Sequence, residues 1–192
     1  MRRYLVIING LGGTGKSEFI KQCAMVAQYF EEKTGVSECS TVDYVKEVAE
    51  SCGWSGEKEA KDRVFLSDLK QALEKWDNVP YKKTIEKINT VWNYMEDEGY
   101  LHGVVFVNSR EENDINNFYN DASLYEAKPI KLYISNNRIE VNEVPELIEG
   151  IESFKTQCDY HIENNGTLFQ LFMSATYFMQ DLLGVELKNE EK

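Results

Sequence analysis

Residues 4–17 join an apolar strand to a glycine-rich turn, and this pairing restricts the folds that the chain can adopt. Residues 4–8 are apolar without alternation, which is typical of a strand covered on both faces. Residues 10–17, Gly-Leu-Gly-Gly-Thr-Gly-Lys-Ser, match the pattern G-x-x-x-x-G-K-[ST]. The sequence therefore predicts a strand, a tight turn and a helix in direct succession.

The glycine-rich turn also has a chemical role. Glycines adopt φ values that strain other residues, so successive N–H groups of the turn can point inward and surround an anion. The positive N-terminus of the following helix adds to this site. We expect the loop to bind the phosphates of ATP, with Lys16 reaching the β- and γ-phosphates and Ser17 ligating Mg²⁺. The predicted nucleotide-binding residues are Gly10, Leu11, Gly12, Gly13, Thr14, Gly15, Lys16 and Ser17.

Beyond the turn, apolar strands alternate with amphipathic helices. Further strands are expected at residues 38–42, 103–107, 130–134 and 159–162. Helices are expected at residues 15–32, 59–76, 81–98, 111–120 and 166–183, with one more starting after residue 43. This order predicts an α/β/α fold of three layers, the P-loop NTPase fold, with about five parallel strands. We expect residues 1–192 to form a single domain.

One expected helix has a clear apolar stripe, which we predict to face the core. In residues 59–76 this stripe contains Phe65, Leu69, Ala72, Leu73 and Trp76.

Polar residues follow the expected strands. Ligands of parallel sheets bind beyond the carboxyl ends of the strands, and Asn9, Asp43, Asn108 and Ser135 lie at or just past those ends. Asp43 is a candidate N-cap of the next helix, and it is equally a candidate to hold an acceptor hydroxyl or a water on Mg²⁺. Arg110 follows Asn108 closely, which makes it a candidate phosphate ligand or the partner in an ion pair at a helix start.

The net charge of −12 limits the partners. No run of Lys and Arg is present, so we expect no nucleic acid polymer as a partner. The acidic excess also repels polyphosphates, so a phosphate site needs individual cations placed close to it. Besides Arg110, the candidates are Lys58, Lys61 and Arg63, and Arg138 in a polar segment where we expect a lid over residues 135–156.

Helical spacing separates two of these cations. Lys61 and Arg63 are two residues apart, so they point to different sides of the helix. Arg63 shares a polar strip with Ser67 and Lys70, and it is the preferred phosphate ligand, whereas Lys61 fits a surface charge equally well. Asp68 lies beside the strip and is a candidate for the acceptor site or for an ion pair with a lysine.

Cysteine spacing and the N-terminus point to an ordinary intracellular chain. The four cysteines contain no C-x-x-C pair, so no zinc site is expected. The apolar run near the N-terminus is too short for a signal-peptide core or a membrane span. We therefore expect a cytoplasmic protein without a membrane partner.

Missing motifs separate the classes of P-loop protein. A GTPase normally carries Asn-Lys-x-Asp, which is absent here. A motor or AAA-type ATPase normally has an apolar strand that ends in an acidic residue, but residues 104–107 lead into Asn108. A small-molecule kinase remains, and it needs cations to gather two phosphate-bearing substrates and a cover against water.

Four stretches resemble the nucleoside monophosphate kinase group of P-loop proteins, and bacterial and phage proteins related to deoxynucleoside monophosphate kinases in particular. They are the phosphate loop, residues 42–46 with 53–58 and 61–70, residues 109–111, and residues 158–168. The resemblance implies phosphoryl transfer from ATP to a small phosphorylated acceptor, with Lys16 and Arg110 as catalytic residues. It implies a helical acceptor-binding insert over residues 54–98. The implied acceptor-binding residues are Asp43, Lys46, Lys61, Arg63, Asp68 and Arg110.

Two alternatives stay open. One is a kinase for another small acceptor, such as dephospho-coenzyme A or a phosphorylated metabolite. The other is a regulatory protein that binds nucleotide with little transferase activity. Asn108 and the single arginine of the expected lid, Arg138, favour the second alternative, because relatives often carry an Asp and several arginines at these places.

Overall fold

A parallel sheet of five strands organises the chain, in the order β2-β3-β1-β4-β5. The strands are β1 (Arg2–Asn9), β2 (Thr34–Ser40), β3 (His102–Asn108), β4 (Ala127–Ser135) and β5 (Tyr160–Glu163). This computed structural model describes residues 1–57, 59–139 and 145–187. The expected strands are confirmed, with shifts at their ends that bear on the site.

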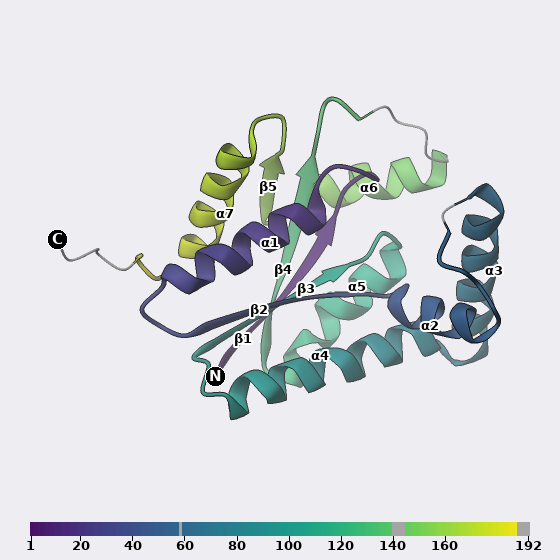
Figure 1. Cartoon of the computed structure of the whole chain (residues 1–192), viewed down its shortest axis with the longest axis horizontal. Helices are drawn as coiled ribbons and strands as arrows, with labels where there is room; N and C mark the ends of the chain where they lie inside the picture. The colour runs from purple at the N-terminus through teal and green to yellow at the C-terminus, as the bar shows by residue number, and fades with distance from the viewer. Residues whose placement is uncertain (58, 140–144, 188–192) are drawn as a thin grey trace.

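Helices cover both faces of the sheet (Figure 1), so the predicted three-layer α/β/α fold is confirmed. α1 (Lys16–Val26) and α7 (Leu168–Leu183) lie on one face, and α4 (Val79–Asp97), α5 (Glu112–Asp121) and α6 (Pro145–Gln157) lie on the other. The remaining helices, α2 (Asp43–Ser51) and α3 (Ala60–Asp77), follow β2. Short 3-10 turns extend α1 at Ala27–Tyr29 and α5 at Ala122–Tyr125.

Alternation along β1 divides the core into two clusters. Val6 and Ile8 pack with Phe19 of α1 and Phe178 of α7, whereas Leu5 and Ile7 belong to the cluster on the other face. Both sets are buried, because successive side chains of a strand point to opposite faces. The unbroken apolar run of β1 therefore reflects its central place between β3 and β4.

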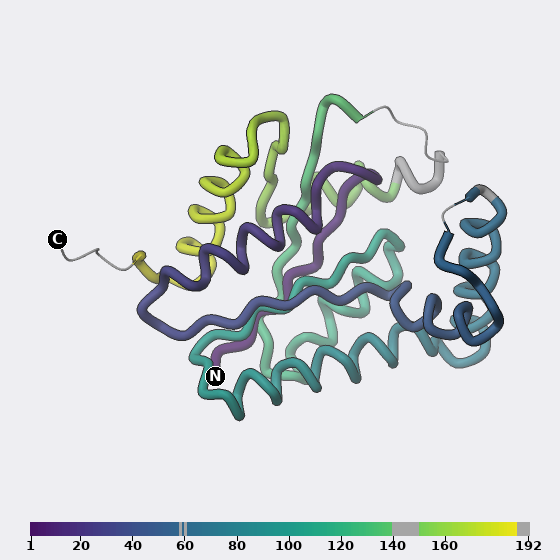
Figure 2. Tube along the Cα trace, in the orientation of Figure 1, coloured from purple at the N-terminus to yellow at the C-terminus, as the bar shows by residue number. Residues whose placement is uncertain are grey.

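The register aligns the carboxyl ends of the central strands. Ile8 of β1 lies beside Asn108 of β3, and Asn108 lies beside Ser40 of β2. The glycine loop, the turn into α2 and the turn into α5 therefore leave the sheet at one edge. Figure 2 follows the chain through this edge, and α2 and α3 lie beyond it.

The start of α2 differs from the prediction. β2 already ends at Ser40, and Val42 rather than Asp43 is the N-cap. Asp43 is the first helical residue, and its carboxylate accepts a hydrogen bond from the Ser40 N–H (3.0 Å) and pairs with Lys87 (2.8 Å). The N-cap prediction was wrong because the chain turns earlier than the apolar pattern indicated.

The apolar stripe predicted for α3 does not face the core. Trp76 is 83% exposed and Phe65 is 39% exposed. The reason is tertiary: α3 packs against α2 and α4 beyond the edge of the sheet and not on one of its faces. α4, by contrast, buries Ile88 and Trp92 against the sheet. Only the first part of the expected helical insert therefore projects from the layers.

α6 is a helix that the sequence pattern did not predict. It covers the second half of residues 135–156, where a lid was expected, and it buries Ile151 and Phe154 in the core. This spacing of three residues is the helical signal that was overlooked. Residues 140–144 lie outside the described residues, and the role of residues 135–156 as a lid stays a prediction.

No helix in the described ranges is long and apolar enough to cross a membrane.

Phe178 tests the layer formed by α1 and α7. Its ring is 3% exposed and contacts the rings of Phe19, Phe106 and Tyr160. We expect Phe178→Ala to lower the free energy of unfolding by about 3–5 kcal/mol, because it leaves a cavity among these rings. Tyr177→Ala is the matched control, since Tyr177 is 65% exposed on the same helix. Equal urea midpoints for the two variants would contradict this packing.

Candidate functional site

The phosphate loop approaches two other segments so closely that side chains are excluded. Gly10 (φ 145°) and Gly15 (φ 92°) have positive φ values. A Cβ atom on Gly10 would overlap the carbonyl oxygen of Ile134 at the end of β4, and one on Gly15 would overlap the amide of Asn164 after β5. We expected such values for all four glycines of the loop, and Gly12 is the one that does not have a positive φ. The glycines thus serve both the turn and its close packing.

Asn164 holds the loop to the last strand. Its Nδ2 donates to the carbonyl oxygen of Thr14 (2.9 Å), and its backbone N–H donates to Ser135 (2.8 Å). Within the loop, the Thr14 hydroxyl donates to the Leu11 carbonyl (3.0 Å). Sequence reasoning treated residues 158–168 as a strand and a helix start and overlooked this contact. The loop is therefore fixed from the β4 and β5 side before any ligand binds.

Lys16 is folded back over the start of the loop. Its Nζ donates to the carbonyl oxygens of Gly10 (2.7 Å) and Leu11 (2.9 Å), and its side chain is buried. The ammonium group consequently lies above the turn whose N–H groups are expected to surround phosphate.

Ser17 contacts a carboxylate that the sequence analysis did not single out. Its hydroxyl donates to Oε1 of Glu38 on β2 at 3.0 Å. Hydroxyl and carboxylate oxygens are ligands that Mg²⁺ prefers, so the donor set fits the metal that accompanies ATP. Glu38 began the expected second strand, and a carboxylate inside a sheet strand was the signal that could have revealed it.

A cavity of about 440 Å³ opens at the carboxyl ends of β2 and β3. α2 and α3 form its other walls. Its lining residues are Ser40, Thr41, Val42, Lys46, Arg63, Leu66, Ser67, Lys70, Asn108, Arg110 and Glu111. The register places this cavity next to the phosphate loop, because β3 pairs with both β1 and β2.

Cations dominate the cavity. Lys46, Arg63 and Arg110 line it together with Lys70, against one carboxylate, Glu111. The charge that lines the cavity is therefore positive, although the net charge of the chain is −12. The polar strip of Arg63, Ser67 and Lys70 that helical spacing predicted faces the cavity. The arrangement favours an anionic ligand.

Lys70 lines the cavity and links α3 to α5 through ion pairs. Its buried ammonium group pairs with Glu74 (2.6 Å), Glu111 (2.6 Å) and Asp114 (3.3 Å). Burial acts to lower the pKa of Lys70, but its hydrogen bonds to Glu111 and Glu74 outweigh this effect and raise the pKa. Burial likewise raises the pKa of Asp114, and the charge of Lys70 opposes part of that shift. The network fixes the helix that carries Arg63.

Three predicted acceptor residues are not among those that line this cavity. Asp43 lines a separate cavity of about 470 Å³ between α2 and α4, where it pairs with Lys87. Lys61 is exposed and pairs with Glu59 (3.0 Å). Asp68 is exposed on α3. Their roles toward an acceptor stay predictions, and Lys58 lies outside the described residues.

Arg138 lies against the turn after β5. Its Nη2 donates to the carbonyl oxygen of Asn165 (2.8 Å), and the neighbouring Asn137 N–H donates to the Asn165 side chain (2.8 Å). Ile139 reaches Gly13 of the phosphate loop. The start of the expected lid thus contacts the loop and the β5–α7 turn rather than the cavity at β2 and β3.

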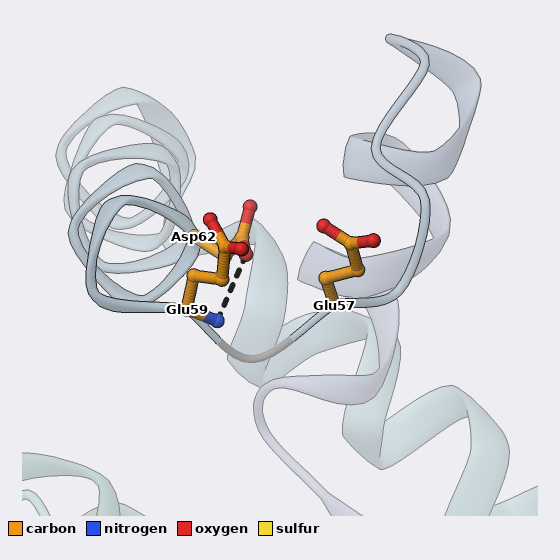
Figure 3. A group of neighbouring side chains, drawn as sticks. All are labelled: Glu57, Glu59 and Asp62. Atoms are coloured by element: carbon orange, nitrogen blue, oxygen red, sulfur yellow. Dashed lines mark hydrogen bonds between the residues drawn. The ribbon is translucent and has the colours of Figure 1, made fainter.

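Three carboxylates gather at the start of α3, as Figure 3 shows. Their oxygens lie within 4.8 Å of one another and belong to Glu57, Glu59 and Asp62. A capping box explains two of them, because Asp62 accepts from the Glu59 N–H (3.0 Å) and Glu59 caps the helix in return. Helix capping therefore accounts for Glu59 and Asp62.

Comparisons with known proteins identify structures with the same fold. No protein-family model matches the chain, and no curated protein matches it in sequence. The tunicamycin resistance protein of Deinococcus radiodurans superposes with a TM-score of 0.52 at 8% identity, covering 98% of this chain and 99% of that one. A protein from Chloroflexus aurantiacus j-10-fl, provisionally named a kinase, gives 0.51 at 14% identity, covering 96% and 98%. The chain shares their fold.

A thymidylate kinase from Candida albicans superposes with a TM-score of 0.48 at 11% identity, over 99% of this chain and 96% of that one.

Gly15→Ala tests the close approach of Asn164. Forcing a side chain to this φ costs about 1–2 kcal/mol, and the overlap with Asn164 adds to that cost. Gly53→Ala is the matched control, because Gly53 has φ 95° and open space around it. We expect Gly15→Ala to lower the free energy of unfolding more than Gly53→Ala does. Adding Asn164→Ala to both variants should narrow the gap, and an unchanged gap would contradict the contact.

Lys70→Met tests the buried ion network through its pH dependence. The variant leaves Asp114 buried without its cation, so we expect the free energy of unfolding to fall by about 3–5 kcal/mol at neutral pH. Without Lys70, the folded-state pKa of Asp114 lies still further above its unfolded value. The folded state then takes up more protons than the unfolded state as pH falls. The deficit, which is the loss of free energy of unfolding relative to wild type, should therefore shrink as pH falls from about 7 to about 5.

Urea unfolding at several pH values measures this deficit. Lys75→Met, an exposed change on the same helix, should show none. A deficit for Lys70→Met that is constant with pH would contradict the role of Asp114.

Proposed function

We propose that this protein is an ATP-dependent kinase that transfers the γ-phosphoryl group to a small phosphorylated acceptor, a nucleoside or deoxynucleoside monophosphate. The observation that carries the proposal is the cation-lined cavity beside the phosphate loop. A loop that binds a triphosphate and a neighbouring site for a second phosphate are the two parts that such a kinase requires. The kinase-named structure with the same fold agrees with this reading.

The two sites lie so that their ligands can meet. The loop leaves β1 after Asn9, and Asn108 and Arg110 follow the adjacent β3. A phosphate in the cavity would thus lie on the side of the sheet edge where the loop begins, and Arg110 lines this cavity. We infer that Arg110 stabilises charge on the transferring group, a role that the fork-shaped arginine side chain suits.

Each residue has a defined task in this proposal. The loop N–H groups and Lys16 bind the β- and γ-phosphates, and Arg63 with Lys46 holds the acceptor phosphate. Bound Mg²⁺ would neutralise phosphate charge, held by Ser17. No protein base is required, because the acceptor phosphate is already an anion and catalysis consists of positioning and charge stabilisation.

The cavity also favours an acceptor with an apolar part. Leu66 and Val42 line it beside the cations, and its volume is within the range of small-molecule sites. A nucleoside monophosphate combines a charged end with a flat, largely apolar base. Dephospho-coenzyme A or another phosphorylated metabolite is the second acceptor class.

A regulatory nucleotide-binding protein is the alternative from another class. Asn108 favours it, since this residue at the end of β3 can neither accept a proton nor add negative charge near a metal. A coupled assay for ADP formation separates the two functions. If neither nucleoside monophosphates, deoxynucleoside monophosphates nor dephospho-coenzyme A raise ADP formation above its basal rate, the kinase proposal fails.

Arg63→Ala tests the acceptor site. A lost charge-assisted hydrogen bond costs about 1.5–3 kcal/mol, so we expect KM for the acceptor to rise about tenfold or more while KM for ATP changes little. Lys75→Ala is the matched control, because Lys75 is an exposed cation of the same helix that does not line the cavity. Equal acceptor KM values for the two variants would contradict the assignment.

A further inference from the structure

We propose that Glu38 is the acidic residue of the Mg²⁺ site. Its carboxylate accepts a hydrogen bond from the Ser17 hydroxyl and would accept another from a water bound to the metal. In related proteins an acidic residue is expected at the end of β3, but this chain has Asn108 there. The inference rests on the proposed function, because it concerns the metal that accompanies ATP.

The contact between Ser17 and Glu38 has the polarity that a metal site needs. The hydroxyl is the donor, and Glu38 Oε1 accepts at 3.0 Å. A hydroxyl that donates its hydrogen keeps its oxygen lone pairs available for a cation. Glu38 therefore orients Ser17 as a ligand.

Strand alternation directs Glu38 toward α1. Cys39 packs in the core cluster on the α4 and α5 face, whereas Val36 packs on the α1 and α7 face. Glu38 lies one residue from Cys39 and two from Val36, so its side chain is on the face of α1. α1 begins at Lys16, which brings the Ser17 hydroxyl to that carboxylate.

A carboxylate here supplies what Asn108 lacks. Mg²⁺ in nucleotide sites keeps several waters and takes one or two carboxylates, and hydrogen-bonded partners fix such ligands. Glu38 lies beside Phe106 in the register, two residues before the pair of Ser40 and Asn108. In this chain the carboxylate is thus on β2, the strand beside β3.

The acidic neighbour of Ser17 in the chain is directed elsewhere. Glu18 accepts a hydrogen bond from Gln22 (2.7 Å) and pairs with Lys21 (3.7 Å), along α1 and away from the loop. At the start of α3, Glu59 and Asp62 form the capping box of that helix. Glu38, by contrast, contacts Ser17 of the phosphate loop.

Mn²⁺ binding, followed by electron paramagnetic resonance in the presence of ATP, tests the inference without relying on activity. Glu38→Gln keeps the size of the side chain and removes its charge. We expect this variant to bind Mn²⁺ about 10- to 100-fold more weakly than wild type, and Ser17→Ala to lose affinity to a similar extent. Glu186→Gln is the matched control, an exposed residue next to Leu187, which pairs with Phe30 beyond the far end of α1.

A calorimetric titration with ATP in the presence of EDTA completes the test. Glu38→Gln should bind metal-free ATP at least as tightly as wild type, because a negative charge near the phosphates is removed. Mn²⁺ affinity equal to wild type would overturn the inference and leave the kinase proposal standing, provided that ATP still binds. Failure of the wild-type protein to bind ATP with or without metal would overturn both.

Discussion

The side-by-side pairing of β1 with β3 and β4 is the constraint on which the rest of the structure depends. It delivers the phosphate loop to the edge where β3 ends, with the end of β4 in contact with Gly10 and the turn after β5 in contact with Gly15. A loop rich in glycine has many conformations to lose, and these neighbours remove that freedom before a ligand arrives. The anion site is therefore preorganised by the sheet.

Charge is the second constraint, because a chain of net charge −12 has to collect phosphates. The structure meets it by concentrating Lys46, Arg63 and Arg110 around one cavity beside the loop. Lys70 is a cation of this cavity with a different duty, since three carboxylates hold it between α3 and α5. Fixing α3 in this way places Arg63, even though most of that helix has no sheet beneath it.

Local pattern predicted the layers well and the ends of elements less well. The buried strands and the helices that cover them carry strong apolar periodicity, and their order alone led to the three-layer fold. Weak patterns failed where tertiary contacts decide: α3 exposes Trp76 because it stands beyond the sheet, and α6 follows a segment that looked irregular. Asp43 begins α2 instead of capping it, because β2 already ends at Ser40. Its carboxylate contacts Lys87 of α4, 44 residues away, which no local pattern indicates.

The sequence by itself determined the phosphate loop and the strip of Arg63 with Ser67, because each depends on spacing within one turn or helix. It also determined the parallel α/β fold, because strands and helices alternate along the chain. The tertiary structure decided which cations share a cavity and which carboxylate reaches Ser17. Glu38 and Ser17 are 21 residues apart and on different elements, and only strand alternation combined with the placement of α1 brings them together. Contacts of that kind arise from packing, so no local pattern contains them.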